Sequence, residues 1–506
     1  MLSAAVGGAC VMAVELLGAR MLSSCYGNSL TAWGSMIAVT LLSLAAGYLV
    51  GGWLADRSAS ARPVWLVVLS AAALIAVLPQ AGAVLRVCRD VCGLRGGALV
   101  GSTLVFSLPL GLLGMIGPFV IRALARDLSG LGMTAGGVLA VSTLGSVAGT
   151  LLSAFWLIPR LGVSSGFRVT AAVAAGAGLV GLLLCAGRRG IPSVAVLLWV
   201  FLLPSGATKP GLSFVAPDGT RMLVEALRDS RYGRIAVLRK GAYRLLVVDG
   251  IVQTGLAVDA TAMSERAYLL DRYHQALIPY AFENPNERSA LVIGLAGGLT
   301  PRLLRRHGMA VASVELDPAV IAVAREWFGF DGAVVAADGR GFVESSETCY
   351  DVCVLDAYAG DAMPAHLFTV EAFRAMARRL APDGLLVVNF IGAPGGDAFA
   401  SVRRTLEAVF AETLALRTEP GEDVQPITIF AAHRAIVFNG EWRRELDGFA
   451  GIDPVSDALV RLRIAPPRGR GRILSDDHNP LDTIRAAEAL RWRERSAENL
   501  GDIGLL

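Results

Sequence analysis

The sequence has little charge, and the shortage is greatest in its first 206 residues. Only 18% of the 506 residues are charged, whereas a soluble globular chain usually carries about 25%. Residues 1–206 contain twelve arginines, no lysine and four acids, a net charge of +8. Residues 207–506 contain 34 basic and 39 acidic side chains, a net charge of −5. This division excludes a single soluble domain, and the acidic polar half excludes a nucleic-acid binder that relies on bulk charge.

The sequence also lacks a cysteine framework and long polar segments. It has seven cysteines, of which Cys88 and Cys92, like Cys349 and Cys353, are four residues apart. No His or Cys cluster close by in sequence completes a zinc site. Because 54% of the chain is hydrophobic, extended disorder is excluded as well. We expect neither a metal site nor structural disulfides.

Long apolar runs fill residues 1–206, separated by short segments that carry arginine. The runs cover roughly residues 2–24, 30–55, 64–85, 97–121, 132–158, 166–186 and 191–206. Most reach the roughly 20 residues that cross about 30 Å of hydrocarbon as a helix. Small residues four apart, as in Gly47 with Gly51 and Gly145 with Gly149, let helices approach closely in lipid. The sequence predicts an all-α polytopic membrane domain of about seven helices over residues 1–206.

The polar half begins with strand-like residues and continues as alternating strands and helices. Residues 221–258 alternate in the manner of β-strands, and Asp249–Gly250 between apolar runs is a hairpin signal. After a helical stretch at 262–282, continuous apolar strands alternate with amphipathic helices, which indicates a parallel sheet covered on both faces. We expect a small β-hairpin domain over 207–260 and a Rossmann-like α/β domain over 261–506.

Two features of the α/β domain are typical of a nucleotide pocket at the carboxyl ends of the strands. The turn GLAGG starts at Gly294 and includes Gly297. Glycines let the backbone come close to a ligand, and the helix N-terminus that follows favours negative groups. Glu315 ends the next strand, 21 residues after Gly294. An acid at that spacing typically binds the ribose hydroxyls of an adenosine-type cofactor.

Two further features follow the next two strands. Asp338 with Gly339 comes directly after the third strand, where a carboxylate can accept a hydrogen bond from an adenine amino group. Asp356 ends the fourth strand. Each residue alone is equally a turn or a helix cap. All four features at one edge of one sheet predict a cofactor pocket.

An ordered series of motifs resembles the spermidine synthase (polyamine aminopropyltransferase) family. The motifs are VVDGIVQT (247–254), YHQALIP (273–279), ALVIGLAGG (290–298), VELDP (314–318), ADGRGF (337–342) and YDVCVLDAYAGDAMPAHLF (350–368). With the apolar first half, the chain resembles the membrane-bound bacterial branch of that family. The resemblance implies a methyltransferase-type Rossmann fold that transfers an aminopropyl group from decarboxylated S-adenosylmethionine to an amine such as putrescine. It implies release of methylthioadenosine and no metal.

The resemblance also implies roles for individual residues. Glu315 would hold the ribose, Asp338 with Gly339 the adenine, and Gln253 would line the same pocket. The substrate-side residues would be Tyr273 and His274, and the catalytic acid would be Asp356.

The sequence departs from the family pattern at three positions. Gly297 stands where the glycine-rich loop usually carries an Asp, and Gly233 where the small β-domain usually carries a Gln. The second carboxylate that binds the amine is replaced by Ala359, and we expect Asp361 to stand in for it. Fewer carboxylates would then face a cationic polyamine, which puts the substrate in question and not the cofactor class.

Three functions stay open at this point. The first is aminopropyl transfer to an amine. The second is methyl or alkyl transfer from S-adenosylmethionine itself, which the loss of the Asp at Gly297 favours. The third is a transporter or sensor with a regulatory cofactor domain. We expect an amine and the lipid bilayer as partners and no nucleic acid, and the resemblance leaves a homo-oligomer open.

The arginines do not decide the orientation in the membrane. Six basic residues fall on each side of the predicted spans, so the positive-inside rule is tied. GGWLADR (51–57) resembles the cytoplasmic loop signature of major-facilitator transporters, which with seven spans would put the C-terminal half outside. We favour a multi-pass inner-membrane protein with a cytoplasmic catalytic domain, because its nucleotide is cytosolic, and the span count stays open.

The last part of the chain offers weaker signals. LSDDHNPLD (474–482) resembles a tail segment of the membrane-bound branch and is equally typical of a solvated turn. His366 is expected to be an ordinary polar position.

Overall fold

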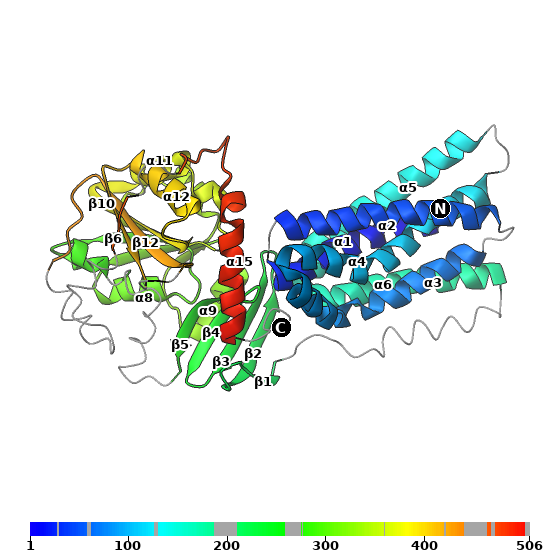
Figure 1. The fold of residues 1–506 in the computed structure, drawn as a ribbon, viewed down its shortest axis with the longest axis horizontal. Coiled ribbons are helices and arrows are strands. Elements are labelled where there is room, and N and C mark those ends of the chain that lie inside the picture. Colours follow the sequence, from blue (N-terminus) through cyan, green and yellow to red (C-terminus); the bar gives the residue numbers. More distant parts are fainter. Residues whose placement is uncertain are drawn as a thin grey trace. The chain divides into compact units, whose positions relative to one another are not determined.

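The computed structural model describes residues 1–27, 30–57, 62–125, 130–186, 210–258, 275, 277–358, 360–418, 421, 423–439, 463–466 and 471–500. The chain forms two compact units. The first, here called the helical unit, holds Met1–Lys209, Arg228–Arg234 and Gly504–Leu506. The second, the α/β unit, holds Pro210–Leu227 and Ile235–Ile503 (Figure 1).

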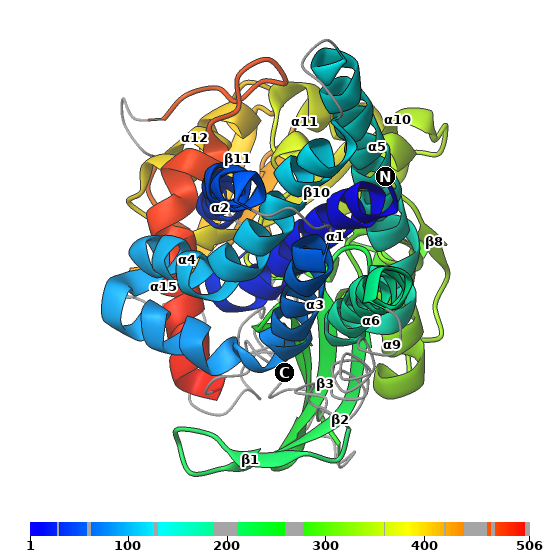
Figure 2. The ribbon, with the colours of Figure 1, turned by 90° about the vertical axis from the view of Figure 1, so that its right-hand side faces the viewer.

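The described part of the helical unit contains six α-helices. They are α1 (Leu2–Tyr26), α2 (Leu30–Asp56), α3 (Arg62–Val77), α4 (Gly82–Leu124), α5 (Leu131–Leu152) and α6 (Ile158–Ala186). A 3₁₀ turn (Leu78–Gln80) follows α3, and a π-helical turn (Ser153–Leu157) joins α5 to α6. Helix α1 contacts each of the other five, and Figure 2 shows this bundle from its end.

Five stretches are long and apolar enough to cross a membrane: Leu2–Ser23, Thr31–Asp56, Arg62–Gln80, Gly96–Leu124 and Leu131–Cys185. The last has 55 residues, about 80 Å of straight helix, and so is far longer than one crossing needs. Gly162, with φ of 76°, breaks it between the predicted runs 132–158 and 166–186. The predicted run 191–206 lies outside the described residues. The described helices therefore support six of the predicted runs, and the expected number of seven is not confirmed.

Both glycine pairs predicted to bring helices together do so. A Cβ atom on Gly145 or Gly149 of α5 would collide with the carbonyl oxygen of Ala5 or Ala9 of α1. Gly47 and Gly51 of α2 meet the backbone of α4 in the same way. Packing at backbone contact is typical of helices that associate in lipid.

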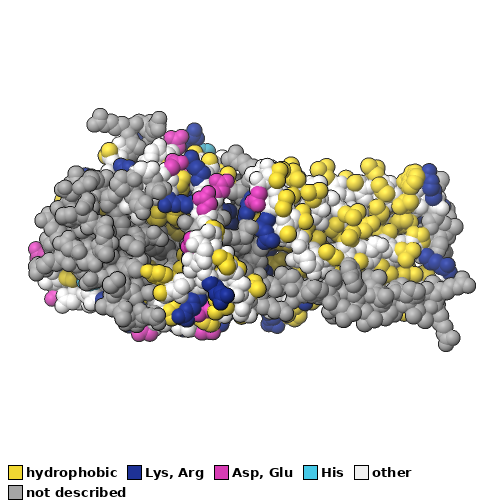
Figure 3. Space-filling view, turned by 60° about the horizontal axis from the view of Figure 1, so that its bottom comes forward, with side chains coloured by type: hydrophobic (Ala, Val, Ile, Leu, Met, Phe, Trp, Pro, Cys, Tyr) yellow, Lys and Arg dark blue, Asp and Glu magenta, His cyan; other side chains and the backbone are white. Residues whose placement is uncertain are grey.

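The outer surface of the helical unit is apolar. Leu41, Leu42, Leu49, Leu104 and Leu144 are between 62% and 77% exposed. Figure 3 shows hydrophobic side chains along the described surface of this unit, with basic side chains at its end. A soluble protein rarely exposes so large an apolar surface, so this surface suits an apolar surrounding.

The α/β unit begins with a five-stranded antiparallel sheet in chain order. Its strands are β1 (Ser213–Val215), β2 (Arg221–Asp229), β3 (Arg234–Lys240), β4 (Tyr243–Val248) and β5 (Ile251–Ala257). The predicted turn at Asp249–Gly250 joins β4 to β5, and both residues have positive φ, 47° and 81°. The expected β-hairpin domain is therefore not confirmed. Residues 213–257 form a five-stranded sheet, of which the predicted hairpin is one part.

The larger sheet of the unit has eight strands in the order β13-β11-β12-β10-β9-β6-β7-β8. They are β6 (Ser289–Ile293), β7 (Ala310–Glu315), β8 (Val334–Ala336), β9 (Tyr350–Leu355), β10 (Leu380–Gly392), β11 (Glu412–Arg417), β12 (Gln425–Ala432) and β13 (Arg463–Ile464). The five strands from β8 to β10 are parallel, and β12, β11 and β13 pair antiparallel. This α/β order matches the predicted Rossmann-like, methyltransferase-type fold.

Helices cover both faces of this sheet, as the sequence predicts (Figure 1). They are α8 (Leu299–Arg306), α9 (Pro318–Phe328), α10 (Gly339–Ser345), α11 (Val370–Arg378), α12 (Asp397–Glu407) and α15 (Leu481–Leu500). Phe373 of α11 and Phe399 of α12 pack in one buried cluster, and Leu304 of α8 packs in another. The chain runs outward from β6 to β8 and returns beside β6 as β9, so the carboxyl ends of β6 and β9 form the switch point where such sheets bind ligands.

Candidate active site

The glycine-rich turn lies directly against the end of β9. Gly294 has φ of 94°, and a Cβ atom there would collide with the carbonyl oxygen of Asp356. The amide of Asp356 donates to the carbonyl of Ile293 at 2.8 Å. Gly298, with φ of 77°, then caps the start of α8. Only glycine suits Gly294 without strain, and this position brings two of the predicted site segments together.

Glu315 fixes this turn to the end of β7. Its Oε2 accepts from the amide of Leu295 at 2.9 Å, and its Oε1 accepts from the amide of Asp317 at 3.0 Å. Burial raises the pKa of Glu315 above its ordinary value, and these backbone amides oppose the rise only in part. Each oxygen keeps a lone pair, so the carboxylate can still accept from a ligand hydroxyl.

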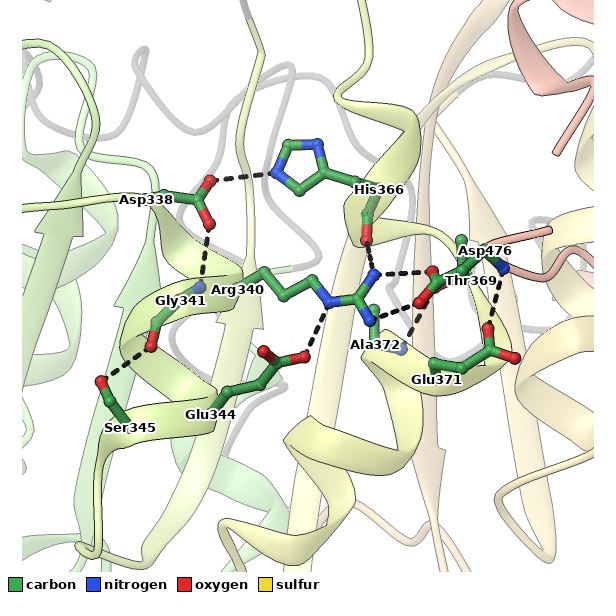
Figure 4. A network of polar contacts seen from close by, with 10 residues as sticks. All are labelled: Asp338, Arg340, Gly341, Glu344, Ser345, His366, Thr369, Glu371, Ala372 and Asp476. Atoms are coloured by element: carbon green, nitrogen blue, oxygen red, sulfur yellow. Dashed lines mark hydrogen bonds and ion pairs between the residues drawn. The ribbon is translucent and has the colours of Figure 1, made fainter.

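Asp338 caps α10 and faces a histidine (Figure 4). Its Oδ1 accepts from the amide of Gly341 at 2.8 Å, and its Oδ2 lies 3.0 Å from Nε2 of His366. Burial acts to raise the pKa of Asp338, but the Gly341 amide and His366 together hold it below its ordinary value. His366 was expected to be an ordinary polar position, and its contact with Asp338 depends on a fold that brings residues 28 apart together.

An ion-pair network extends from this point (Figure 4). Arg340 donates to both carboxylate oxygens of Asp476 at 2.6 Å each, and to Glu344 at 2.8 Å. It also donates to the carbonyl of His366 at 3.2 Å. The pKa of Arg340 is raised, mainly by the hydrogen bond to Asp476. The segment LSDDHNPLD therefore borders this end of the site.

Asp356 is held by two side-chain amides. Its Oδ2 accepts from Nε2 of Gln275 at 3.2 Å, and its Oδ1 accepts from Nδ2 of Asn389 at 2.8 Å. Gln275 and Asn389 are both buried. Because each amide donates to a different oxygen, the two together fix the orientation of the carboxylate.

Gln275 also joins Asp356 to the glycine-rich turn. Its Oε1 accepts a hydrogen bond from the hydroxyl of Thr300, in the first turn of α8. A signal for Gln275 was present, because it is the third residue of the motif YHQALIP, but the resemblance pointed to its neighbours. Asn389 had a signal too, since it is the polar residue in the apolar strand GLLVVNF (384–390). Sequence reasoning missed both residues.

Asp361 forms an ion pair with an arginine of the same chain, Arg493. Its Oδ1 lies 2.7 Å from Nη2 of Arg493 and its Oδ2 lies 3.2 Å from Nε, with both side chains buried. An amine would have to compete with this guanidinium. The binding of the amine by Asp361 stays a prediction.

Three further predicted pocket residues lie near the same edge of the eight-stranded sheet: Gln253, Gly297 and Gly339. Gln253 donates from Nε2 to the carbonyl of Gly360 at 3.1 Å. Gly297 donates from its amide to Oγ1 of Thr254 at 3.2 Å, and a Cβ atom on it would collide with the Thr254 methyl group. A Cβ atom on Gly339 would likewise collide with Ile293.

Tyr273 and His274 lie outside the described residues, as does Ala359. Among the residues that the structure describes, no three His, Cys, Asp or Glu side chains form a group that could hold a metal ion.

Comparison with known proteins identifies a family domain within the α/β unit. Residues 270–390 match the family model of the spermine/spermidine synthase domain. This stretch of the chain is thus a spermine/spermidine synthase domain. The polyamine aminopropyltransferase of Mycobacterium tuberculosis is 28% identical over 405 residues, covering 71% of this chain and 75% of that protein. The N-terminal histidine N-methyltransferase of Emericella nidulans is 29% identical over 285 residues.

The overlap with these relatives is partial. The alignment with the Emericella nidulans protein covers 49% of this chain and about half (50%) of that protein. A probable spermidine synthase from Corynebacterium glutamicum has a TM-score of 0.40 at 19% identity, covering 44% of this chain and 88% of its own. Spermidine synthase from Thermotoga maritima has a TM-score of 0.37 at 22% identity, covering 51% and 92%. The matched domain and the relatives named as polyamine aminopropyltransferases indicate a transferase domain.

Proposed function

We propose that the α/β unit transfers an aminopropyl group from decarboxylated S-adenosylmethionine to a small amine, with Asp356 as the catalytic base. The observation that carries this proposal is the position of Asp356. Its carboxylate lies at the switch point beside the glycine-rich turn, where a ligand presents its reacting group. The match of residues 270–390 to the spermine/spermidine synthase domain supports the reaction class.

The chemistry needs a base and an aligned approach. An alkylamine has a pKa of about 10.4 and is protonated near neutral pH, so it has no lone pair with which to attack. Asp356 takes one proton from the ammonium. The nitrogen lone pair then forms a bond to the carbon next to the sulfonium, the carbon–sulfur bond breaks, and its electron pair leaves with methylthioadenosine. Gln275 and Asn389 keep the Asp356 carboxylate aimed at the amine, which contributes orientation.

The same edge of the sheet would hold the nucleoside. We assign the ribose hydroxyls to Glu315, whose backbone contacts fix it beside the turn, and the adenine amino group to Asp338 with Gly339. Gln253 would line the pocket through its contact with Gly360. Tyr273 and His274 remain the proposed amine-side residues.

The glycine at position 297 bears on whether the co-substrate is the decarboxylated or the intact cofactor. The resemblance expects an Asp there, and the Thr254 methyl group fills the position of any side chain. The amino end of the decarboxylated cofactor would then lack that carboxylate. The deciding experiment is mass spectrometry of products from purified protein, given each sulfonium cofactor in turn with a panel of amines. Aminopropylated product and methylthioadenosine support the proposal, whereas methylated product overturns it.

We further propose that the helical unit lies in the cell membrane with the α/β unit in the cytoplasm. Its apolar helices have the necessary length, and their outer surface is apolar. The proposed nucleotide is made in the cytosol, which is the reason for the orientation.

A further inference from the structure

We propose that the C-terminal segment 474–500 positions the loop 357–368 that follows Asp356, and that Asp361 is a positioning residue bound to Arg493 and not a ligand of the amine. This inference rests on the proposed function for its catalytic readout. It assigns a role to LSDDHNPLD and to α15, which the reaction itself does not use.

The first anchor is a buried ion pair. The Asp361 and Arg493 side chains are 11% and 7% exposed, and Arg493 contacts both carboxylate oxygens in a bidentate arrangement. Burial acts to raise the pKa of Asp361, but Arg493 outweighs it and holds the pKa below its ordinary value. Bidentate pairs of this kind are geometrically specific.

An amine ligand does not fit this arrangement. An ammonium group that binds the Asp361 carboxylate must either displace the guanidinium of Arg493 or lie beside it as a second cation. The first would separate a buried guanidinium from its carboxylate, and the second would bring two positive charges together, so both are unfavourable. Arg493 therefore supplies the positive charge and the hydrogen bonds that the Asp361 carboxylate needs.

Arg493 and Arg485 also tie the loop to two other segments. Arg493 donates from Nη1 to the carbonyl of Asp249, at the β4–β5 turn, at 3.0 Å. Arg485 donates from Nη1 to the carbonyl of Asp361 at 2.7 Å and from Nε to the carbonyl of Ile391, at the end of β10, at 2.8 Å. One face of α15 thus fixes the loop against both sheets of the α/β unit.

The second anchor lies at the far end of the loop. Arg340 bridges the Asp476 carboxylate and the carbonyl of His366 (Figure 4). Asn479 donates from Nδ2 to the carbonyl of Ala365 at 2.7 Å. The loop that begins at Asp356 is thereby held near its start by α15 and near its end by the segment before α15. The position of the base and the position of His366 depend on the same C-terminal segment.

The test compares Arg493→Gln, Asp361→Asn and the double variant in the full-length protein. A matched control is Arg491→Gln, on the same helix, whose partner Asp423 is 2.6 Å away in an exposed pair. Because misplacing a reacting group by about 1 Å can cost about 100-fold in rate, we expect each single change at the buried pair to lower kcat by up to about 100-fold. The double variant should be no worse than either single variant, since both remove one interaction. Arg491→Gln should leave kcat unchanged.

A role in amine binding gives the opposite result. Arg493→Gln would then liberate a carboxylate and lower KM for a diamine, and Asp361→Asn would raise KM for a diamine more than for a monoamine. Either outcome overturns the inference. Arg493→Lys keeps the charge and should restore part of kcat, which separates positioning from loss of folding.

Hydrogen exchange supplies a readout that needs no reaction. In the detergent-solubilised full chain, Arg493→Gln should raise amide exchange in 357–368, and Arg491→Gln should not. Unchanged exchange in that loop overturns the inference. If the wild-type protein transfers nothing to any amine, the proposed function fails while the exchange result still decides the role of Arg493.

Discussion

The carboxylate of Asp356 accepts a hydrogen bond from the side-chain amide of Gln275, although 81 residues separate the two in sequence. The same glutamine accepts from Thr300, so one side chain links the proposed base to the helix that follows the glycine-rich turn. The proposed base and the proposed cofactor turn are therefore physically connected.

Asp356→Asn should lower turnover by about 100-fold or more, because an amide cannot accept the proton of the amine. The change keeps the size of the side chain and so should leave methylthioadenosine binding intact. Single-turnover rates and calorimetry measure the two effects separately. Near-normal turnover in this variant would rule out Asp356 as the base.

Gln275→Glu should move the acid limb of the pH–rate profile to higher pH. A second carboxylate beside Asp356 repels its negative charge, so the base is ionised only at higher pH. Gln275→Leu removes the donor without adding charge, and should lower kcat without that displacement. An unshifted profile in Gln275→Glu would show that Gln275 does not face the base during turnover.

The sequence could predict the parts of the site that depend on local order, and it missed the parts that depend on distant pairing. Gly294, Glu315, Asp338 and Asp356 each end a strand or begin a helix, and parallel strands bring such positions to one edge. Arg493 meets Asp361 across 132 residues, and neither residue carries a pattern that names its partner. In the helical unit, apolar length predicted the helices, whereas the kink at Gly162 was not evident from composition.

Gly297→Ala should destabilise the α/β unit by about 1 to 3 kcal/mol, because the added methyl group overlaps the side chain of Thr254. Thr254→Ser removes the methyl group and keeps the hydroxyl that accepts from the Gly297 amide. The double variant should recover much of the loss. Denaturant unfolding of the four proteins measures this coupling, and strictly additive effects would contradict the contact.

Asp338 should contribute stability that disappears in acid. Its pKa lies below the ordinary value of 3.8 in the folded protein, so its ionised form stabilises the fold above that value. This contribution falls as the pH drops through the lowered pKa. Asp338→Asn should therefore flatten the loss of unfolding free energy below about pH 4 relative to the wild type. Equal slopes for the two proteins would contradict the contacts with Gly341 and His366.

A reporter fused after Lys209 should give a cytoplasmic signal. The nucleotide proposed for the α/β unit is cytosolic, and a domain that uses it must lie on that side of the membrane. A phosphatase that is active only outside the cytoplasm and a fluorescent protein that folds inside it give opposite readings at the same fusion point. A second pair of fusions in the segment 126–129, between α4 and α5, fixes the orientation of the helices themselves. An external signal after Lys209 would remove the catalytic proposal, because the α/β unit would then be separated from its co-substrate.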